Sequence, residues 1–171
     1  MTDLEIHPVR SDEAPALVTA GCQAGYIEDR LALHAAGHGV LLAAWLDGSP
    51  AGSVYLWLAP AEEPEIREFR PGTPLITHLE VFENARNRGI GTRLMAVAES
   101  ELRARGFRQV ALAVELSNTR ALDLYERLGY RDWGCDFVVC ARRDWNEDGT
   151  FVDTPEKCYV LTKSLAKAPC D

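Results

Sequence analysis

The feature that most restricts the fold of this chain is the change of apolar periodicity between residues 75 and 114. From Leu75 to Phe82, apolar and polar side chains alternate, which is typical of a strand with one covered face. From Gly89 to Arg105, apolar side chains recur at helical spacing and form one stripe. Residues 110–114 are again β-branched and apolar. The sequence therefore predicts a strand, a helix and a second strand in succession.

The remaining apolar patterns predict a single α/β domain over residues 1–171. Turn residues at 47–50 connect two predicted strands, and short connections of this kind imply a mixed rather than a fully parallel sheet. Residues 59–74 contain four prolines and four glutamates, so we expect a loop or a short irregular helix there. The other predicted elements are strands over residues 4–9, 40–46, 52–58, 135–140 and 158–162, and helices over residues 11–20, 26–35 and 118–128, with a long polar loop between the last two strands.

Charge and hydropathy exclude several classes of protein. The 18 basic and 26 acidic residues give a net charge of -8, the opposite of what a duplex-binding domain carries, so we expect no nucleic-acid partner. The longest apolar run, Val40–Leu46, is far shorter than the ~20 residues of a membrane-spanning helix. The acidic N-terminus has no apolar segment of the signal-peptide type. We therefore expect a cytoplasmic protein with no membrane partner.

The five cysteines do not form a recognisable framework. Their number is odd, their spacings are wide and no C-x-x-C occurs, which argues against disulfide pairing and against a zinc ribbon. We expect no bound metal, and we expect the thiols to act as small buried hydrophobic groups. These residues are Cys22, Cys135, Cys140, Cys158 and Cys170.

The turn between residues 82 and 90 has the properties of an anion site. Backbone N–H groups at the start of a helix are unpaired, and the helix dipole adds to their attraction for a phosphate. Gly89 and Gly91 have no side chains to block a close approach, and residues 84–98 carry three arginines and no acid. The pattern equally fits a basic helix start with glycines for packing. The Rossmann pattern fails because Leu94 replaces its third glycine, and no P-loop pattern is present.

Two motifs resemble those of a known family. The segment R-N-R-G-I-G at residues 86–91, after a strand that ends L-E-V, resembles the R/Q-x-x-G-x-G/A signature of the Gcn5-related N-acetyltransferases (GNATs). The segment N-T-R-A-L-D-L-Y-E-R-L-G-Y at residues 118–130 is similar to that family's N-x-x-A-x-x-L-Y-x-x-x-G-F/Y motif. The resemblance implies the single-domain GNAT fold, a mixed, mostly antiparallel sheet of about six or seven strands with about four helices. In that fold the two central strands splay apart in a V.

The resemblance also implies acetyl-CoA as co-substrate and a set of residues that bind it. Backbone amides of residues 88–92 would hold the pyrophosphate, and backbone groups near Leu79 and Val81 would hold the pantetheine arm. An amide at or near Val81 would face the thioester oxygen. Asn118 would cap its helix, contact the cofactor, or do both. The implied cofactor-binding residues are Leu79, Val81, Arg86, Arg88, Gly89, Ile90, Gly91, Thr92, Asn118 and Tyr125.

Three residues are predicted to be catalytic. Tyr125 matches the family's general acid, and a phenol can protonate a leaving thiolate. The alternative is a core tyrosine, because Tyr125 shares a helical stripe with apolar residues. Glu80, and next His78, are predicted to act as the base that deprotonates the amine, because both project from one face of the strand beside the thioester. The alternative for this pair is a solvated or salt-bridged strand face.

The resulting prediction is an N-acetyltransferase that moves an acetyl group from acetyl-CoA to a small-molecule or peptide primary amine, by direct attack in a ternary complex. The alternative is a catalytically silent acyl-CoA-binding regulatory domain on the same fold. Acidic residues at 62–68 and 144–156 would attract a cationic amine, or would serve solubility alone. Exposed edge strands near the C-terminus are compatible with a homodimer, although the sequence does not require one.

Overall fold

The computed structural model describes residues 1–166, which form one mixed sheet covered by helices on both faces. The strands are β1 (Leu4–Pro8), β2 (Gly39–Leu46), β3 (Ser49–Trp57), β4 (Leu75–Val81), β5 (Gln109–Glu115), β6 (Arg131–Asp132), β7 (Val138–Trp145) and β8 (Phe151–Ser164). The helices are α1 (Ala14–Thr19), α2 (Ala24–Ala35), α3 (Pro64–Phe69), α4 (Ile90–Ala104) and α5 (Thr119–Arg127), with short 3-10 turns at Ser11–Glu13 and Glu83–Ala85. Within this part of the chain, no helix is long and apolar enough to cross a bilayer.

The sheet has eight strands in the order β1-β2-β3-β4-β5-β8-β6, and β7 pairs with β8 outside this path. The β4–β5 pair is parallel, and every other pair is antiparallel. The predicted mixed, mostly antiparallel sheet is therefore confirmed, with one strand more than the upper end of the expected range.

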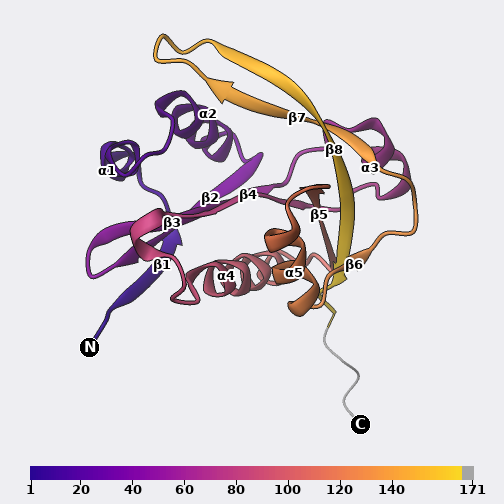
Figure 1. Cartoon of the computed structure of the whole chain (residues 1–171), viewed down its shortest axis with the longest axis horizontal. Helices are drawn as coiled ribbons and strands as arrows, with labels where there is room; N and C mark the ends of the chain where they lie inside the picture. The colour runs from indigo at the N-terminus through magenta and orange to yellow at the C-terminus, as the bar shows by residue number, and fades with distance from the viewer. Residues whose placement is uncertain (167–171) are drawn as a thin grey trace.

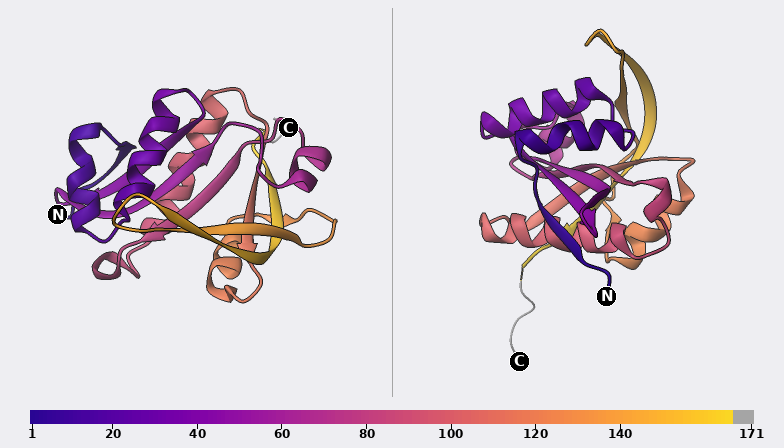
Figure 2. Two further views of the ribbon diagram at one scale, coloured as in Figure 1. Left: turned by 90° about the horizontal axis from the view of Figure 1, so that it is seen from above. Right: turned by 90° about the vertical axis from the view of Figure 1, so that its left-hand side faces the viewer.

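Helices α1 and α2 lie over one face of the sheet, and α4 and α5 lie over the other (Figures 1 and 2). The apolar stripe of α4 explains its position, because Leu94, Ala98 and Leu102 are fully buried where α4 packs on β2, β3 and β4. On the opposite face, Leu17 of α1 and Ile27 of α2 are equally buried, in a separate core. The sheet is thus the middle layer of three, and its strand ends carry the candidate site.

A β-bulge interrupts the pairing of β4 with β3. Tyr55 pairs with Thr77 and Ser53 pairs with Glu80, so β4 has one residue more than β3 over this interval. His78 adopts a positive φ of 53° at that point. β4 and β5 share one register pair, between Leu75 and Ala111, and β4 diverges from β5 beyond Leu75. The predicted V-shaped splay is therefore present, and the extra residue lies in the diverging part of β4.

The prediction of a long polar loop before the last strand is wrong. Residues 138–164 form a continuous hairpin, in which β8 is 14 residues long and begins at Phe151. The charged residues that suggested a loop pair with one another across the two strands. Arg143 lies opposite Asp153 and binds both of its carboxylate oxygens at 2.8 Å. A strand whose polar residues find cross-strand partners has no apolar alternation to reveal it.

The cysteines follow the prediction in part. Cys22 and Cys158 are buried and Cys140 is half-buried, as small hydrophobic groups would be. Cys135 is exposed, contrary to the prediction, because it lies in the turn before β7. Cys170 lies outside the described residues.

Candidate functional site

The start of α4 forms an exposed set of backbone N–H groups. Gly89 caps the helix with a left-handed φ of 74°, a conformation that costs a glycine little. Arg93 donates the first intrahelical bond, to the carbonyl of Gly89 at 3.1 Å. The amides of residues 90–92 precede this bond and have no partner within the helix. The helix start is therefore arranged as an anion site.

A hollow of about 450 Å³ extends from this helix start into the splay, and we call it the α4 groove. Every residue predicted to bind the cofactor lines the α4 groove, except Arg88, whose side chain lies outside it. The full lining is Leu79, Glu80, Val81, Arg86, Asn87, Gly89, Ile90, Gly91, Thr92, Asn118, Arg120, Ala121, Leu124, Tyr125 and Arg127. Two motifs that lie nearly thirty residues apart in sequence thus meet at one surface.

Arginines dominate the charge of the α4 groove, where Glu80 is the one acidic lining residue. Arg86 donates from Nε to the carbonyl of Val81 at 3.1 Å and so fixes the turn between β4 and α4. Arg120 donates to Oδ1 of Asn87 at 3.2 Å, which ties α5 to the same turn. Sequence reasoning missed Arg120 and Arg127. They fall at variable positions of the second motif, so only their place in the fold identifies them.

Tyr125 lies where the α4 groove meets a second hollow, of about 380 Å³, which we call the central pocket. The two hollows share Leu79, Asn118, Ala121 and Tyr125. Burial raises the pKa of Tyr125 to about 12, so its phenol stays protonated at neutral pH. The Tyr125 ring also packs edge-on against Tyr130, at 5.9 Å between centroids. The core role and the site role considered for Tyr125 are thus compatible.

Asn118 caps α5 through its side chain. Its Oδ1 accepts the N–H of Ala121 at 3.2 Å. Because Asn118 also lines both hollows, the helix cap and a place at the site coexist in one residue.

His78 and Glu80 project from the bulge towards α2. The ring of His78 stacks on Tyr26 at 4.3 Å between centroids, and its Nε2 lies 3.7 Å from Oε2 of Glu80. The hydrogen bond from His78, with the nearby charge of Arg86, holds the pKa of Glu80 below its usual range, although partial burial opposes this shift. Glu80 lines the α4 groove and His78 lines the central pocket. The two side chains are therefore neighbours, and the pair borders both hollows.

The central pocket has walls from β4, β5, α2, α3 and the β7–β8 hairpin. Its polar wall contains Glu62 and Glu63 from the acidic segment, whereas Glu65 and Glu68 lie elsewhere. Its aromatic wall contains Tyr26 and Trp57, to which the sequence assigned no role. The full lining is Tyr26, Arg30, Trp57, Glu62, Glu63, Ile66, Leu75, Thr77, His78, Leu79, Ala113, Val114, Glu115, Asn118, Ala121, Tyr125, Cys140, Ala141, Arg142, Arg143, Glu156 and Cys158.

A sequence profile of the acetyltransferase (GNAT) family matches residues 6–130. The chain belongs to this family. The prediction of the family is confirmed. Mycothiol acetyltransferase of Streptosporangium roseum is 50% identical over 50 residues, which are 29% of this chain and 15% of that protein. This chain therefore spans only a small part of that relative.

Solved structures of GNAT proteins share the fold over almost the whole chain. An N-acetyltransferase from Staphylococcus aureus Mu50 superposes with a TM-score of 0.69 at 13% identity, over 96% of this chain and 99% of that one. A GNAT family acetyltransferase from Elizabethkingia anophelis with acetyl-CoA bound gives a TM-score of 0.62 at 19% identity, over 94% of this chain and 97% of that one. At these identities the likeness supports the fold alone.

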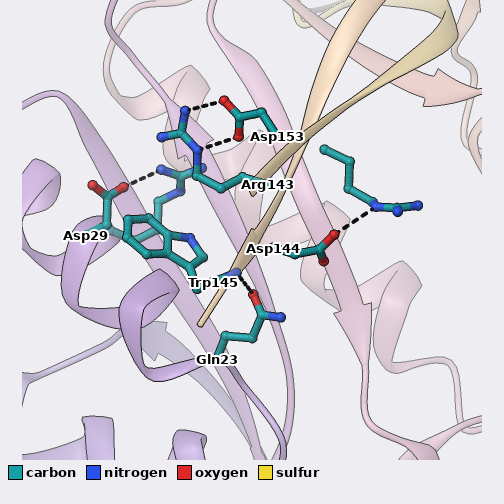
Figure 3. A network of polar contacts seen from close by, with 8 residues as sticks. Gln23, Asp29, Arg143, Asp144, Trp145 and Asp153 are labelled. Atoms are coloured by element: carbon teal, nitrogen blue, oxygen red, sulfur yellow. Dashed lines mark hydrogen bonds and ion pairs between the residues drawn. The ribbon is translucent and has the colours of Figure 1, made fainter. Parts of the chain in front are cut away.

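In this GNAT domain the tip of the β7–β8 hairpin is fastened to α2 (Figure 3). The backbone N–H of Trp145 donates to Oε1 of Gln23 at 2.9 Å. The Trp145 ring fits over Gly25, where an added Cβ would lie only 2.5 Å from ring atom Cε3. Arg143, bound to Asp153, also lies beside this contact. The hairpin therefore closes one side of the central pocket.

Proposed function

We propose that this protein is an acetyl-CoA-dependent N-acetyltransferase that acts on a primary amine in a ternary complex. The observation that carries the proposal is the meeting of the two hollows at Tyr125. A cofactor in the α4 groove and an amine in the central pocket would come together at that residue. This shared boundary supports the proposal, because direct transfer requires both substrates at one point.

Acetyl-CoA fits the α4 groove in charge and in shape. The amides of residues 90–92 would bind the pyrophosphate, with help from Arg120 and Arg127 on the facing helix. The pantetheine arm would lie in the splay beyond Leu75, where the backbone of β4 has left β5. Leu79 and Val81 would bind it there, and an amide near Val81 would stabilise the thioester oxyanion.

The residues at the boundary can supply the proton transfers. Attack of the neutral amine on the thioester forms the new C–N bond, and collapse of the oxyanion breaks the C–S bond. Tyr125 would give its proton to the departing CoA thiolate, and the amine would lose its proton to Glu80 through water. Proton return from solvent restores Tyr125. The base is useful because an alkylamine of pKa about 10.4 is almost wholly protonated at neutral pH.

A catalytically silent acyl-CoA-binding domain is the second candidate. It shares the α4 groove, so the fold does not separate it from an enzyme. Tyr125 favours the enzyme, because its protonated phenol lies at the boundary of the two hollows, where a departing thiolate would need a proton.

Thermal unfolding with acetyl-CoA, CoA and NAD in parallel tests the cofactor site. A ligand at about 100 times its Kd adds about 2.7 kcal/mol of stability, which raises the melting temperature of a protein this size by several degrees. We expect this shift with acetyl-CoA and CoA and none with NAD. If neither CoA form shifts the melting temperature, the α4 groove is not a CoA site. If CoA binds but no amine is acetylated, the silent domain is favoured.

A further inference from the structure

Two of the five cysteines lie next to each other in the β7–β8 hairpin, although their spacing in the sequence argued against pairing. In the hairpin register Cys140 lies opposite Glu156, and Cys158 lies opposite Val138. The two cysteines are therefore diagonal neighbours on one face of the hairpin. Both line the central pocket, and their side chains are within hydrogen-bonding range of each other. The fold thus presents a pair of thiols to one cavity.

The two thiols differ in acidity. The hydrogen bond from Cys140 lowers the pKa of Cys158, although burial and nearby carboxylates oppose this shift. The same hydrogen bond, together with burial, raises the pKa of Cys140. Cys158 therefore ionises first, and a thiolate is the form that reacts with oxidants. Glu63 is also within hydrogen-bonding range of Cys140, where it is placed to accept the proton of that thiol.

The strand that carries Cys140 has room to adjust. Among the described residues β7 pairs with β8 alone, and its contact with α2 is at the far end, at Trp145. Cys158, by contrast, is held in the sheet opposite Glu115 of β5. Diagonal Cα atoms in a regular antiparallel pair are about 7–8 Å apart and a disulfide needs about 4.4–6.8 Å, so β7 must move by about 1 Å to close the bond. A disulfide formed against such a displacement is readily reduced, as a reversible modification requires.

This displacement acts on one hollow and not on the other. Ala141 and Arg142 follow Cys140 in β7 and line the central pocket, so they move with it. None of the described cysteines lines the α4 groove. Oxidation of the pair therefore alters the cavity assigned above to the amine and leaves the one assigned to acetyl-CoA unchanged.

We propose that Cys140 and Cys158 form a reversible disulfide, closed by a peroxide, that slows acetylation of the amine. The Cys158 thiolate attacks one oxygen of hydrogen peroxide and the O–O bond breaks, which gives a sulfenic acid and a hydroxide that takes up the proton lost by Cys158. The sulfur of Cys140 then attacks the sulfenic sulfur and forms the S–S bond. Its proton passes through Glu63 to the departing hydroxide, which leaves as a second water. A dithiol reductant restores both thiols and is itself oxidised to a disulfide.

Peptide mapping tests whether the bond forms. The protein is treated with a few equivalents of hydrogen peroxide, its remaining thiols are blocked with iodoacetamide in denaturant, and it is digested with trypsin without reductant. Cleavage after Arg131, Arg142 and Lys157 places Cys140 on residues 132–142 and Cys158 on residues 158–163. Residues 132–142 also contain Cys135, so the test uses the Cys135→Ser variant beside the wild type. We expect a product that joins the two peptides, lighter than their sum by two hydrogen atoms and separated again by dithiothreitol.

Cys22 is the internal control. It packs in the other core, with Leu17 and Ile27, and burial with the charge of Glu80 raises its pKa to about 11. Its thiol should therefore be blocked by iodoacetamide to the same extent before and after peroxide.

The double variant Cys135→Ser/Cys140→Ser is the matched control for the pair. It should give no joined peptide, and thermal unfolding checks that it is folded.

Kinetics and thermal unfolding test the effect of the bond, and this arm alone rests on the proposed function. Peroxide is removed with catalase before each assay. Because a displacement of about 1 Å at a reacting site costs up to about 100-fold in rate, kcat/KM for the amine should fall about 10-fold in the oxidised Cys135→Ser protein and return with dithiothreitol. The rise in melting temperature with acetyl-CoA should be the same in both forms. The double variant should keep its rate after peroxide.

The outcomes separate this proposal from the proposed function. No joined peptide, or a cysteine oxidised to an acid that dithiothreitol does not restore, would overturn the disulfide. A joined peptide with unchanged amine kinetics would overturn its control of the central pocket. If the reduced protein acetylates no amine, the proposed function fails, and the peptide map still decides whether the disulfide exists.

Discussion

At the scale of single residues, Tyr125 shows how one side chain joins core and site. Its ring closes the core under α5, against Tyr130, and its position at the end of the splay places it on both hollows. The burial that the core demands is the same burial that raises the pKa of the phenol to about 12. The apolar stripe that made a core role plausible therefore also keeps the proton in place.

Removal of the phenolic hydroxyl tests this role. Tyr125→Phe keeps the ring and its packing, so the melting temperature should change little. Without a proton donor for the thiolate, kcat should fall about 100-fold, within the usual range for general acid catalysis. The KM for acetyl-CoA should stay near that of the wild type. Steady-state kinetics with acetyl-CoA varied at saturating amine gives both constants, and an unchanged kcat would exclude Tyr125 from the mechanism.

The carboxylate of Glu80 should determine how the rate depends on pH. Its pKa lies below the usual value because of the hydrogen bond from His78, so Glu80 is ionised throughout the neutral and mildly acidic range. The rise of kcat/KM with pH should then follow deprotonation of the amine, with no inflection from Glu80 above its ordinary pKa. Glu80→Gln should lower kcat/KM about 100-fold at every pH in this range, since the base is absent at all of them.

His78→Ala is the complementary variant for the same pair. Without the hydrogen bond and charge of His78, the pKa of Glu80 should rise towards its ordinary value or above it. Glu80 then protonates at a higher pH, so the variant should lose activity at the acidic end of the profile and little at pH 8. A profile parallel to that of the wild type would show that His78 does not tune the base.

At the scale of secondary-structure elements, the bulge in β4 depends on a glycine in the neighbouring strand. A Cβ at Gly52 in β3 would lie 2.5 Å from the carbonyl oxygen of Glu80 and 3.2 Å from Leu94. Gly91 at the start of α4 is a contrasting case, because a Cβ there would make ordinary contacts, at 3.5 Å with Val81 and 3.8 Å with Leu124. The close approach at Gly52 therefore lies where β3 and β4 resume their pairing after the bulge.

Alanine at the two glycines should have opposite outcomes. Gly52→Ala forces the backbones of β3 and β4 apart, and overpacking of this kind costs about 1 to 3 kcal/mol, so the melting temperature should fall by several degrees. Gly91→Ala should leave the melting temperature and the acetyl-CoA KM nearly unchanged, since the family signature accepts alanine there. Thermal unfolding of both variants compares them, and equal stability would show that the bulge tolerates a side chain at Gly52.

At the scale of the whole molecule, a buried polar cluster joins the last strand to the central helix. Lys163 of β8 binds both carboxylate oxygens of Glu99 on α4, at 2.9 and 3.0 Å. Tyr130, after α5, donates to the same carboxylate at 2.9 Å. Glu99 is only 6% exposed, so its charge depends on these partners. The cluster thereby fixes β8, and with it the hairpin over the central pocket, to the rest of the fold.

Lys163→Met should destabilise the protein by about 1 to 3 kcal/mol, because the buried carboxylate loses its closest cation. Chemical denaturation measures this change. The double variant Glu99→Leu/Lys163→Met, which removes both charges, should recover part of the loss, since an apolar pair leaves no unpaired charge in the core. A double variant that is as unstable as Lys163→Met alone would contradict this explanation.

The cytoplasmic location and the homodimer stay predictions. In and beside the hairpin, Phe137, Val139 and Val152 are each more than half exposed. Nothing in the described residues identifies what would cover them.

The sequence alone indicated the family, the mixed α/β fold with its mostly antiparallel sheet, the start of α4 and the place of Tyr125 on a helix. These features depend on local patterns, namely periodicity, glycine turns and two spaced motifs, which neighbouring residues largely dictate. The sequence left open whether His78, Glu80 and the acidic residues belong to a site or to a solvated surface. An extra residue in a strand, or an ion pair across two strands, has no local sequence pattern.

Only the tertiary structure decided where those residues lie. β4 leaves β5 beyond Leu75, and the hollows beside this splay meet at Tyr125. The hairpin brings the neutralising acid Asp153 beside Arg143, and the loop before α3 brings Glu62 and Glu63 into the same wall. Which charges remain unpaired depends on distances between segments far apart in the chain. Those distances are set by packing rather than by local sequence.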